Sequence, residues 1–264
     1  MTVEAIAALQ REVANVKAVA ATLSPEEWAA ASDCAGWRVQ DVVCHMASVY
    51  EQIASPGSMP SSDDGDAEKT AELAVEARRD WSPEQVMAAY EEWSDKGVAA
   101  LAGLQEPPMA DAVVPLGNLG SHPLHLLANA IVFDHYCHLR HDILAPGGTV
   151  ERAPLPPDEG ALAAAVEWML AGLPQMCADG LEALDRPLNL VFTGPAAGSW
   201  VLRPGDGLSV VERGEAADAA ASVTTTAHDF VQWGTKRRDW RVSGVTVTGD
   251  EAYAASVLDA VNVI

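Results

Sequence analysis

The chain has 264 residues, of which 49% are hydrophobic and 20% charged, so it is long enough to bury a sizeable core without disulfides. Its formal net charge is -22, from 38 acidic and 16 basic side chains. A surface this negative repels nucleic acid and anionic lipid headgroups, so we expect neither nucleic acid nor a membrane as a partner.

The sequence contains no stretch of eighteen apolar residues, and its amphipathic, early-acidic beginning does not resemble a leader peptide. The cysteines lie apart, without a CxxC pair, which favours reduced thiols over a disulfide framework. We therefore expect a cytoplasmic protein whose thiols are Cys34, Cys44, Cys137 and Cys177.

Apolar side chains recur at three-and-four spacing from residue 3 to residue 22, which predicts a helix with one buried face. The stretch Ser24-Pro25-Glu26-Glu27 is typical of the N-cap and first turn of a short helix. A further apolar repeat between residues 39 and 53 predicts the helix that carries His45.

Residues 58–66 are polar and turn-rich, and they predict a connection. Helical composition resumes at 68–104, with a break near Ser82-Pro83, and residues 105–120 again favour a loop. Residues 123–143 predict the helix that carries Asp134 and His138. Four principal helices before residue 145 indicate a helical bundle.

Glycine and proline concentrate at residues 145–157, the best candidate for a domain boundary. Beyond it, a helix at 159–173 precedes short strands, a helix near 228–233, a strand at 242–248 and a helix at 250–261. The predicted fold class is a two-domain α+β protein, with a helical bundle at 1–147 and a small α+β domain at 158–264.

His45, Asp134 and His138 together offer two imidazoles and a carboxylate, a donor set that suits a divalent metal with one position open for chemistry. Residues four apart share one helix face, so Asp134 and His138 can bind one ion. The same helix also carries His135, His141 and Asp142, which form other donor sets, and a histidine on an apolar face is often a core residue. Spacing alone does not choose among them.

The stretch from Cys34 to His45 (CAGWRVQDVVCH) resembles the start of the DinB-like metal-binding domain of mycothiol-dependent maleylpyruvate isomerases. The resemblance selects His45, Asp134 and His138 as the metal ligands. Residues 219–226, 228–233 and 245–250, with Arg237-Arg238, are similar to the sterol-carrier-like C-terminal domain that accompanies this bundle.

Two positions depart from the family pattern. The family usually has Glu where this chain has Asp134, which predicts weaker or altered metal binding. The family also commonly has an Asp three residues after the second histidine, whereas this chain has His141 there and Asp142 one residue further on. Substrate chemistry or the support of the ligands is therefore expected to differ.

The resemblance implies a divalent-metal-dependent enzyme, with Zn²⁺ as the first choice of metal and other divalent ions as alternatives. A low-molecular-weight thiol such as mycothiol would bind the metal as thiolate and attack a small-molecule electrophile. We favour thiol S-transfer over isomerisation of maleylpyruvate, because nothing in the sequence identifies that substrate. We expect a monomer or a homodimer.

Further residues are secondary candidates for catalysis, most of them on the predicted helix at 123–143. Arg140 is a candidate to anchor a substrate carboxylate, as are Arg78 and Arg79, while His141 and Asp142 are candidates to orient ligands or move protons. Two other functions remain open from the residues. One is a binding protein whose metal is structural or absent, and the other is a metal-dependent hydrolase on the same bundle.

Overall fold

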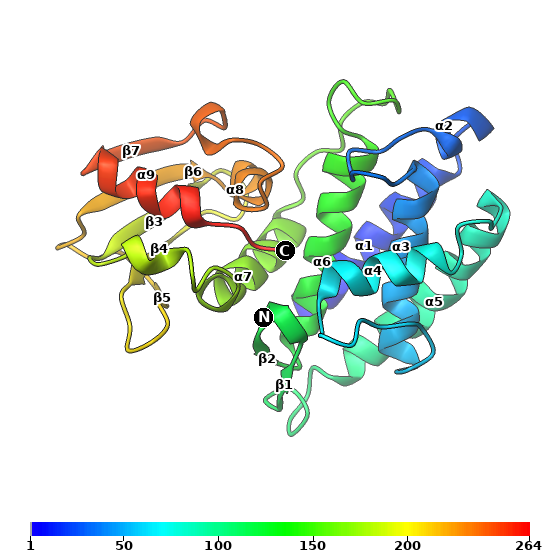
Figure 1. Ribbon diagram of the computed structural model, residues 1–264, viewed down its shortest axis with the longest axis horizontal. Helices are drawn as coiled ribbons and strands as arrows, with labels where there is room; N and C mark the ends of the chain where they lie inside the picture. Colours follow the sequence, from blue (N-terminus) through cyan, green and yellow to red (C-terminus); the bar gives the residue numbers. More distant parts are fainter. Residues whose placement is uncertain (1) are drawn as a thin grey trace. The chain divides into compact units, whose positions relative to one another are not determined.

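A computed structural model describes residues 2–264 and divides the chain into two compact units between Pro156 and Pro157 (Figure 1). The first unit is mainly helical, and the second contains a five-stranded sheet with helices. This confirms the predicted two-domain α+β class. Each unit has its own buried apolar core.

Long helices form the core of the first unit: α1 (Thr2–Ala20), α3 (Val39–Ala54), α5 (Pro83–Gly103) and α6 (Leu126–Cys137). Helix α3 packs along α5, and α1 packs against both α5 and α6 (Figure 1). Nearly every residue in the first three turns of α3 is buried, so side chains at the centre of this helix face other helices instead of solvent. His45 lies in that stretch.

Short elements connect these helices. Helix α2 (Pro25–Ala29) begins with the predicted capping box, in which Ser24 and Glu27 exchange hydrogen bonds, and α4 (Ala67–Glu76) follows the polar loop. Strands β1 (Val113–Pro115) and β2 (Ser121–Pro123) form a hairpin around the 3-10 turn η1 (Gly117–Leu119). The sequence predicted only a loop there, because three-residue strands are too short to show a period.

The predicted helix at 123–143 is two elements in the structure. Helix α6 ends at Cys137, and the chain continues as the π-helix η2 (His138–Ile143). A π-helix carries more residues per turn than an α-helix, so it changes the direction in which the side chains after His138 point. The residues after His138 therefore do not follow the spacing of one continuous α-helix.

The second unit contains a sheet with the strand order β5-β4-β3-β6-β7, in which β3 and β6 are parallel and the other neighbours antiparallel. Within residues 2–264, no helix is both long and apolar enough to cross a membrane. The elements of this unit are α7 (Glu159–Met176), η3 (Leu181–Ala183), β3 (Leu188–Thr193), β4 (Gly198–Arg203), β5 (Val210–Arg213), β6 (Ala221–Thr226), α8 (Ala227–Gly234), η4 (Trp240–Val242), β7 (Thr246–Gly249) and α9 (Glu251–Ala260).

Candidate metal centre

The start of α3 is fixed by a buried carboxylate. Asp41 accepts a hydrogen bond from the backbone N–H of Arg38 at 2.9 Å and ion pairs with the guanidinium groups of Arg38 at 2.8 Å and Arg79 at 3.0 Å. Burial alone would raise the pKa of Asp41, but these bonds outweigh it and lower the pKa. His45 lies one turn further along α3, so this cap holds the helix that presents His45.

The three predicted ligands converge. One donor atom from each of His45, Asp134 and His138 lies within 4.8 Å of the others. Asp134 Oδ1 is 3.0 Å from His45 Nε2 and 3.4 Å from His138 Nε2. Ligand atoms about 2.0 Å from a tetrahedral metal stand about 3.3 Å apart, so these distances fit a divalent ion without rearrangement of the helices.

A second carboxylate orients His138. The Nδ1–H of His138 donates to Asp142 Oδ2 at 2.7 Å, and the carboxylate of Asp142 is buried. This bond leaves the Nε2 lone pair of His138 directed toward the cluster, which is how ligand histidines are usually held. Asp142 lies four residues after His138, a spacing that places two side chains on the same face of a helix. Cys34 Sγ also lies 3.6 Å from His138 Nδ1.

The pKa values of the two imidazoles of the cluster are shifted in opposite directions. Burial lowers the pKa of His45. For His138 burial acts the same way, but the charge of Asp134 and the hydrogen bonds of His138 to Asp134 and Asp142 outweigh it and raise the pKa well above its ordinary value. Burial raises the pKa of Asp134, yet His138 and His45 hold it well below its usual range. A metal ion must therefore replace a proton on His138.

Trp37 forms one wall of the cluster. Its ring centroid is 5.3 Å from that of His45 and 6.5 Å from that of His138, and its Nε1–H donates to Glu72 Oε2 of α4 at 2.6 Å. Trp37 is half-buried. The Gly36-Trp37 lead-in thus supplies both the turn into α3 and an aromatic wall for the ligands.

The structure places the three secondary candidates differently. Asp142 reaches the cluster, as described. The guanidinium of Arg140 does not, because it pairs with the buried carboxylate of Glu12 at 2.5 and 2.9 Å and stacks on Tyr136. His141 is buried with its ring centroid 6.0 Å from that of Tyr136. Asp142 therefore contacts the predicted ligand His138, whereas Arg140 is held by Glu12.

The other arginines considered as substrate anchors are also engaged. Arg78 is buried against Glu51 and Ser48. Arg79 pairs with Asp41, Glu72 and Glu76. Both side chains therefore neutralise carboxylates of the helical unit, and neither faces the metal ligands.

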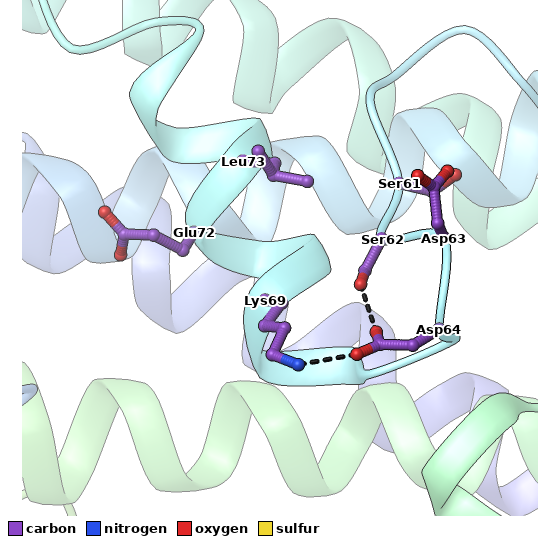
Figure 2. A pocket seen from close by; sticks show the side chains of 7 residues that line it. All are labelled: Ser61, Ser62, Asp63, Asp64, Lys69, Glu72 and Leu73. Atoms are coloured by element: carbon purple, nitrogen blue, oxygen red, sulfur yellow. Dashed lines mark hydrogen bonds and ion pairs between the residues drawn. The ribbon is translucent and has the colours of Figure 1, made fainter.

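A shallow depression of about 490 Å³ lies beside α4, along the loop that precedes this helix (Figure 2). Figure 2 shows that Lys69 reaches Asp64 across it and that Ser62 bonds the same carboxylate, whereas Glu72 extends from the opposite side of α4. The predicted ligands are not among its lining residues. The depression and the cluster are separate features, connected through the bond between Glu72 and Trp37.

Fold and cluster together define a two-unit α+β protein with a candidate His/Asp/His metal site in its helical unit. Residues 9–143, just over half of the chain, match the family model described as the mycothiol maleylpyruvate isomerase N-terminal domain. The chain belongs to this family. No curated protein matches the sequence significantly.

Solved structures support the same fold over both units. The mycothiol-dependent maleylpyruvate isomerase is similar with a TM-score of 0.59 at 13% identity, covering 94% of this chain and 93% of that chain. A histidine-to-alanine mutant of the mycothiol-dependent maleylpyruvate isomerase is similar with a TM-score of 0.55 at 12% identity and the same coverage. At such low identity the likeness concerns the fold alone.

Sequence reasoning missed several neighbours of the cluster. Cys34 and Trp37 belong to the quoted motif, but the motif alone did not indicate that their side chains face His138 and His45. His135 was weighed only as an alternative ligand, and the structure places it behind Asp134. These positions depend on how α3, α5 and α6 pack, and no spacing in the sequence contains that information.

Proposed function

We propose that this chain is a divalent-metal-dependent enzyme that transfers a low-molecular-weight thiol, mycothiol in the first instance, to a small-molecule electrophile. The observation that carries the proposal is the convergence of His45, Asp134 and His138 within 4.8 Å, in the part of the chain that matches the family. A bound divalent metal, with zinc as the first choice, would bind the thiol sulfur and lower its pKa toward neutrality.

The residues divide the work as follows. His45 and His138 supply neutral imidazole nitrogens and Asp134 one carboxylate oxygen, so the ion keeps a residual positive charge. Asp142 holds the proton of His138 on Nδ1 and so keeps Nε2 available as a donor. Trp37 covers the two imidazoles from one side, and the half-buried His138 with Cys34 marks the side open to solvent.

The broader transferase function is favoured over isomerisation. In an isomerase the thiol adds to a double bond, the adduct rotates and the thiol leaves, whereas in a transferase the adduct is the product. Recognition of a substrate carboxylate needs a cation, and Arg78, Arg79 and Arg140 are all paired with carboxylates of the protein. An electrophile that does not need a cation to bind a carboxylate therefore fits the helical unit better.

Metal analysis tests the first part of the proposal. We expect about one equivalent of divalent metal in the purified protein and a loss of most of it in His45→Ala and His138→Ala. His228→Ala, in the second unit, is the matched control and should keep its metal. Full metal occupancy in both ligand variants would contradict the site.

A thiol titration of the cobalt-substituted protein tests the second part. Thiolate binding should add a sulfur-to-cobalt charge-transfer band in the near ultraviolet and shift the visible bands. Turnover with a model electrophile should require both metal and thiol. A protein that binds cobalt but ignores the thiol, and that hydrolyses esters or amides instead, would identify the metal-dependent hydrolase.

A protein without metal in any form would favour the binding protein of the sequence analysis. The cytoplasmic location and the monomeric or dimeric state stay predictions. The structure forms no disulfide among Cys34, Cys44, Cys137 and Cys177, which is compatible with a reducing compartment.

A further inference from the structure

His135 follows Asp134 on α6 and is completely buried, with 0% of its surface exposed. Its ring lies near the rings of Tyr50 of α3 and Tyr90 of α5, at centroid distances of 5.0 and 6.0 Å. The two tyrosine rings are themselves 6.1 Å apart. The imidazole is therefore confined by three helices, and a buried polar ring at such a position calls for a physical reason.

The contacts of His135 define its tautomer. Its Nδ1 lies 3.0 Å from the backbone oxygen of Ile131 and 3.2 Å from Oδ2 of Asp134. Both neighbours can only accept a hydrogen bond, so Nδ1 must carry a proton, which it donates to Ile131 while Oδ2 of Asp134 lies beside it. Nε2 has no hydrogen-bond partner among residues 2–264, which suits a lone pair better than a second buried N–H.

This contact reaches the oxygen of Asp134 that the ligand histidines do not use. Oδ1 faces Nε2 of His45 and of His138, and Oδ2 faces Nδ1 of His135. Among residues 2–264 Oδ2 makes no fully formed hydrogen bond, so the approach of His135 Nδ1 at 3.2 Å is the ion-pair contact that holds it. The contact with His135 therefore opposes rotation of the carboxylate, which would exchange the two oxygens or turn both away from the cluster.

We propose that His135 is a positioning residue, which holds the carboxylate of Asp134 so that a single oxygen faces the metal. This inference rests on the metal site of the proposed function. A short aspartate side chain has little freedom to correct its own orientation, so a donor behind it matters more than it would for a longer glutamate. The tyrosines act through packing, because they prevent the imidazole from turning away.

Substitutions at residue 135 separate this role from packing. His135→Phe fills the same space without a donor, whereas His135→Asn places an amide N–H near the position of Nδ1. We expect His135→Phe to bind Co²⁺ about 10- to 100-fold more weakly, measured by competition with a chelator, and His135→Asn to restore most of the affinity. Tyr90→Phe, which removes a hydroxyl without a hydrogen-bond partner among residues 2–264, is the packing control and should bind like the wild type.

The visible spectrum of the cobalt complex gives a second readout. Release of the carboxylate in His135→Phe should change the intensity and position of the d–d bands, and His135→Asn should return them toward the wild-type spectrum. Wild-type cobalt affinity and an unchanged spectrum in a folded His135→Phe would overturn the inference. The same holds if His135→Asn and His135→Phe lose affinity equally.

The tautomer itself is testable in the wild-type protein, in case the variants do not fold. Imidazole ¹⁵N spectra of the metal-free protein should show the proton of His135 on Nδ1. A proton on Nε2 would overturn the inference and leave the proposed function standing. A wild-type protein that binds no cobalt would instead overturn both, so the two failures are distinguishable.

Discussion

Asp134 shows how a shorter carboxylate serves the cluster. The resemblance to the family predicted Glu at this position and therefore weaker metal binding in this chain. In the structure Oδ1 already stands 3.0 and 3.4 Å from the two imidazole nitrogens, close to the ligand spacing of a bound ion. The helices therefore bring the shorter side chain of Asp134 close enough to both imidazoles to bind the same ion.

This geometry predicts the effect of restoring the family residue. Asp134→Glu moves the carboxylate about 1.5 Å beyond the position at which Oδ1 faces both imidazoles, so we expect the affinity for Co²⁺ to fall by about tenfold or more. Competition with a chelator measures it, and Asp134→Asn, which removes the charge at constant length, is the reference for complete loss. An affinity equal to or higher than that of the wild type would show that the aspartate limits the site.

Protonation of His138 predicts the pH dependence of metal binding. Because the pKa of His138 is raised, the metal-free protein keeps this proton to a higher pH than an ordinary imidazole does, and a metal must displace it. We expect the affinity for Co²⁺ to rise by about tenfold per pH unit below that pKa, with one proton released per ion. Isothermal titration in buffers of different ionisation enthalpy measures the proton, and pH-independent affinity would contradict the prediction.

At the scale of elements, the sequence predicted the beginning of α3 but not the contacts that hold it in place. The Gly36-Trp37 turn and the apolar repeat predicted the helix and His45 on it. The structure adds that Asp41 is buried between Arg38 and Arg79, which ties the start of α3 to the end of α4. That contact is long-range, and charge pairing across more than thirty residues leaves no periodic signal.

The buried pairs of Asp41 predict a stability effect with a defined pH window. Asp41→Asn removes the charge that two guanidinium groups compensate, so we expect the free energy of unfolding to fall by about 2–4 kcal/mol at neutral pH. The pKa of Asp41 is lowered from its ordinary value of 3.8. Its contribution is therefore complete above that value and lost as the pH falls through the lower folded-state pKa.

Urea unfolding of wild type and Asp41→Asn at several pH values measures this difference. The difference in free energy of unfolding between wild type and Asp41→Asn should become smaller below about pH 3.8. Asp63→Asn, on the exposed loop before α4, is the control and should unfold like the wild type at every pH. A constant gap across the acid range would show that Asp41 acts through packing instead of charge.

The π-helix η2 is the element that sequence reasoning could not supply. Apolar spacing from 123 to 143 fits one continuous helix, because a single wide turn changes the period by too little to detect. That turn nevertheless carries Asp142 to His138 Nδ1 and Arg140 to Glu12. The ligand His138 was predicted, and Asp142 was a candidate to orient it because residues four apart share a helix face, whereas the pairing of Arg140 with Glu12 was not predicted.

At the scale of the whole molecule, the candidate metal ligands all lie in the first of the two units. The His/Asp/His cluster lies within the unit that ends at Pro156, and the sheet lies in the unit that begins at Pro157. A metal bound by the cluster therefore stabilises the helical unit directly. Its effect on the second unit is expected to be small, because linkage acts on the unit that binds.

Hydrogen exchange with and without metal tests this separation. At a free Co²⁺ concentration about 100-fold above Kd, binding should add about 2.7 kcal/mol of protection against opening of the helical unit. Peptides from residues 2–156 should exchange more slowly, and those from 157–264 should change little. His45→Ala should abolish the effect, and equal protection in both units would contradict the separation.

The amino-acid sequence alone was enough to predict the main helices, the two-domain α+β class and, once the motif from Cys34 to His45 had linked them, three candidate ligands. These features are local or repeat along the chain, so composition, motif and periodicity carry them. Tertiary packing was needed to show which oxygen of Asp134 faces the imidazoles, that Asp142 and not Arg140 reaches His138, and that His135 lies behind the carboxylate. Each of these depends on the packing of distant helices or on one π-turn, and neither leaves a period in the sequence.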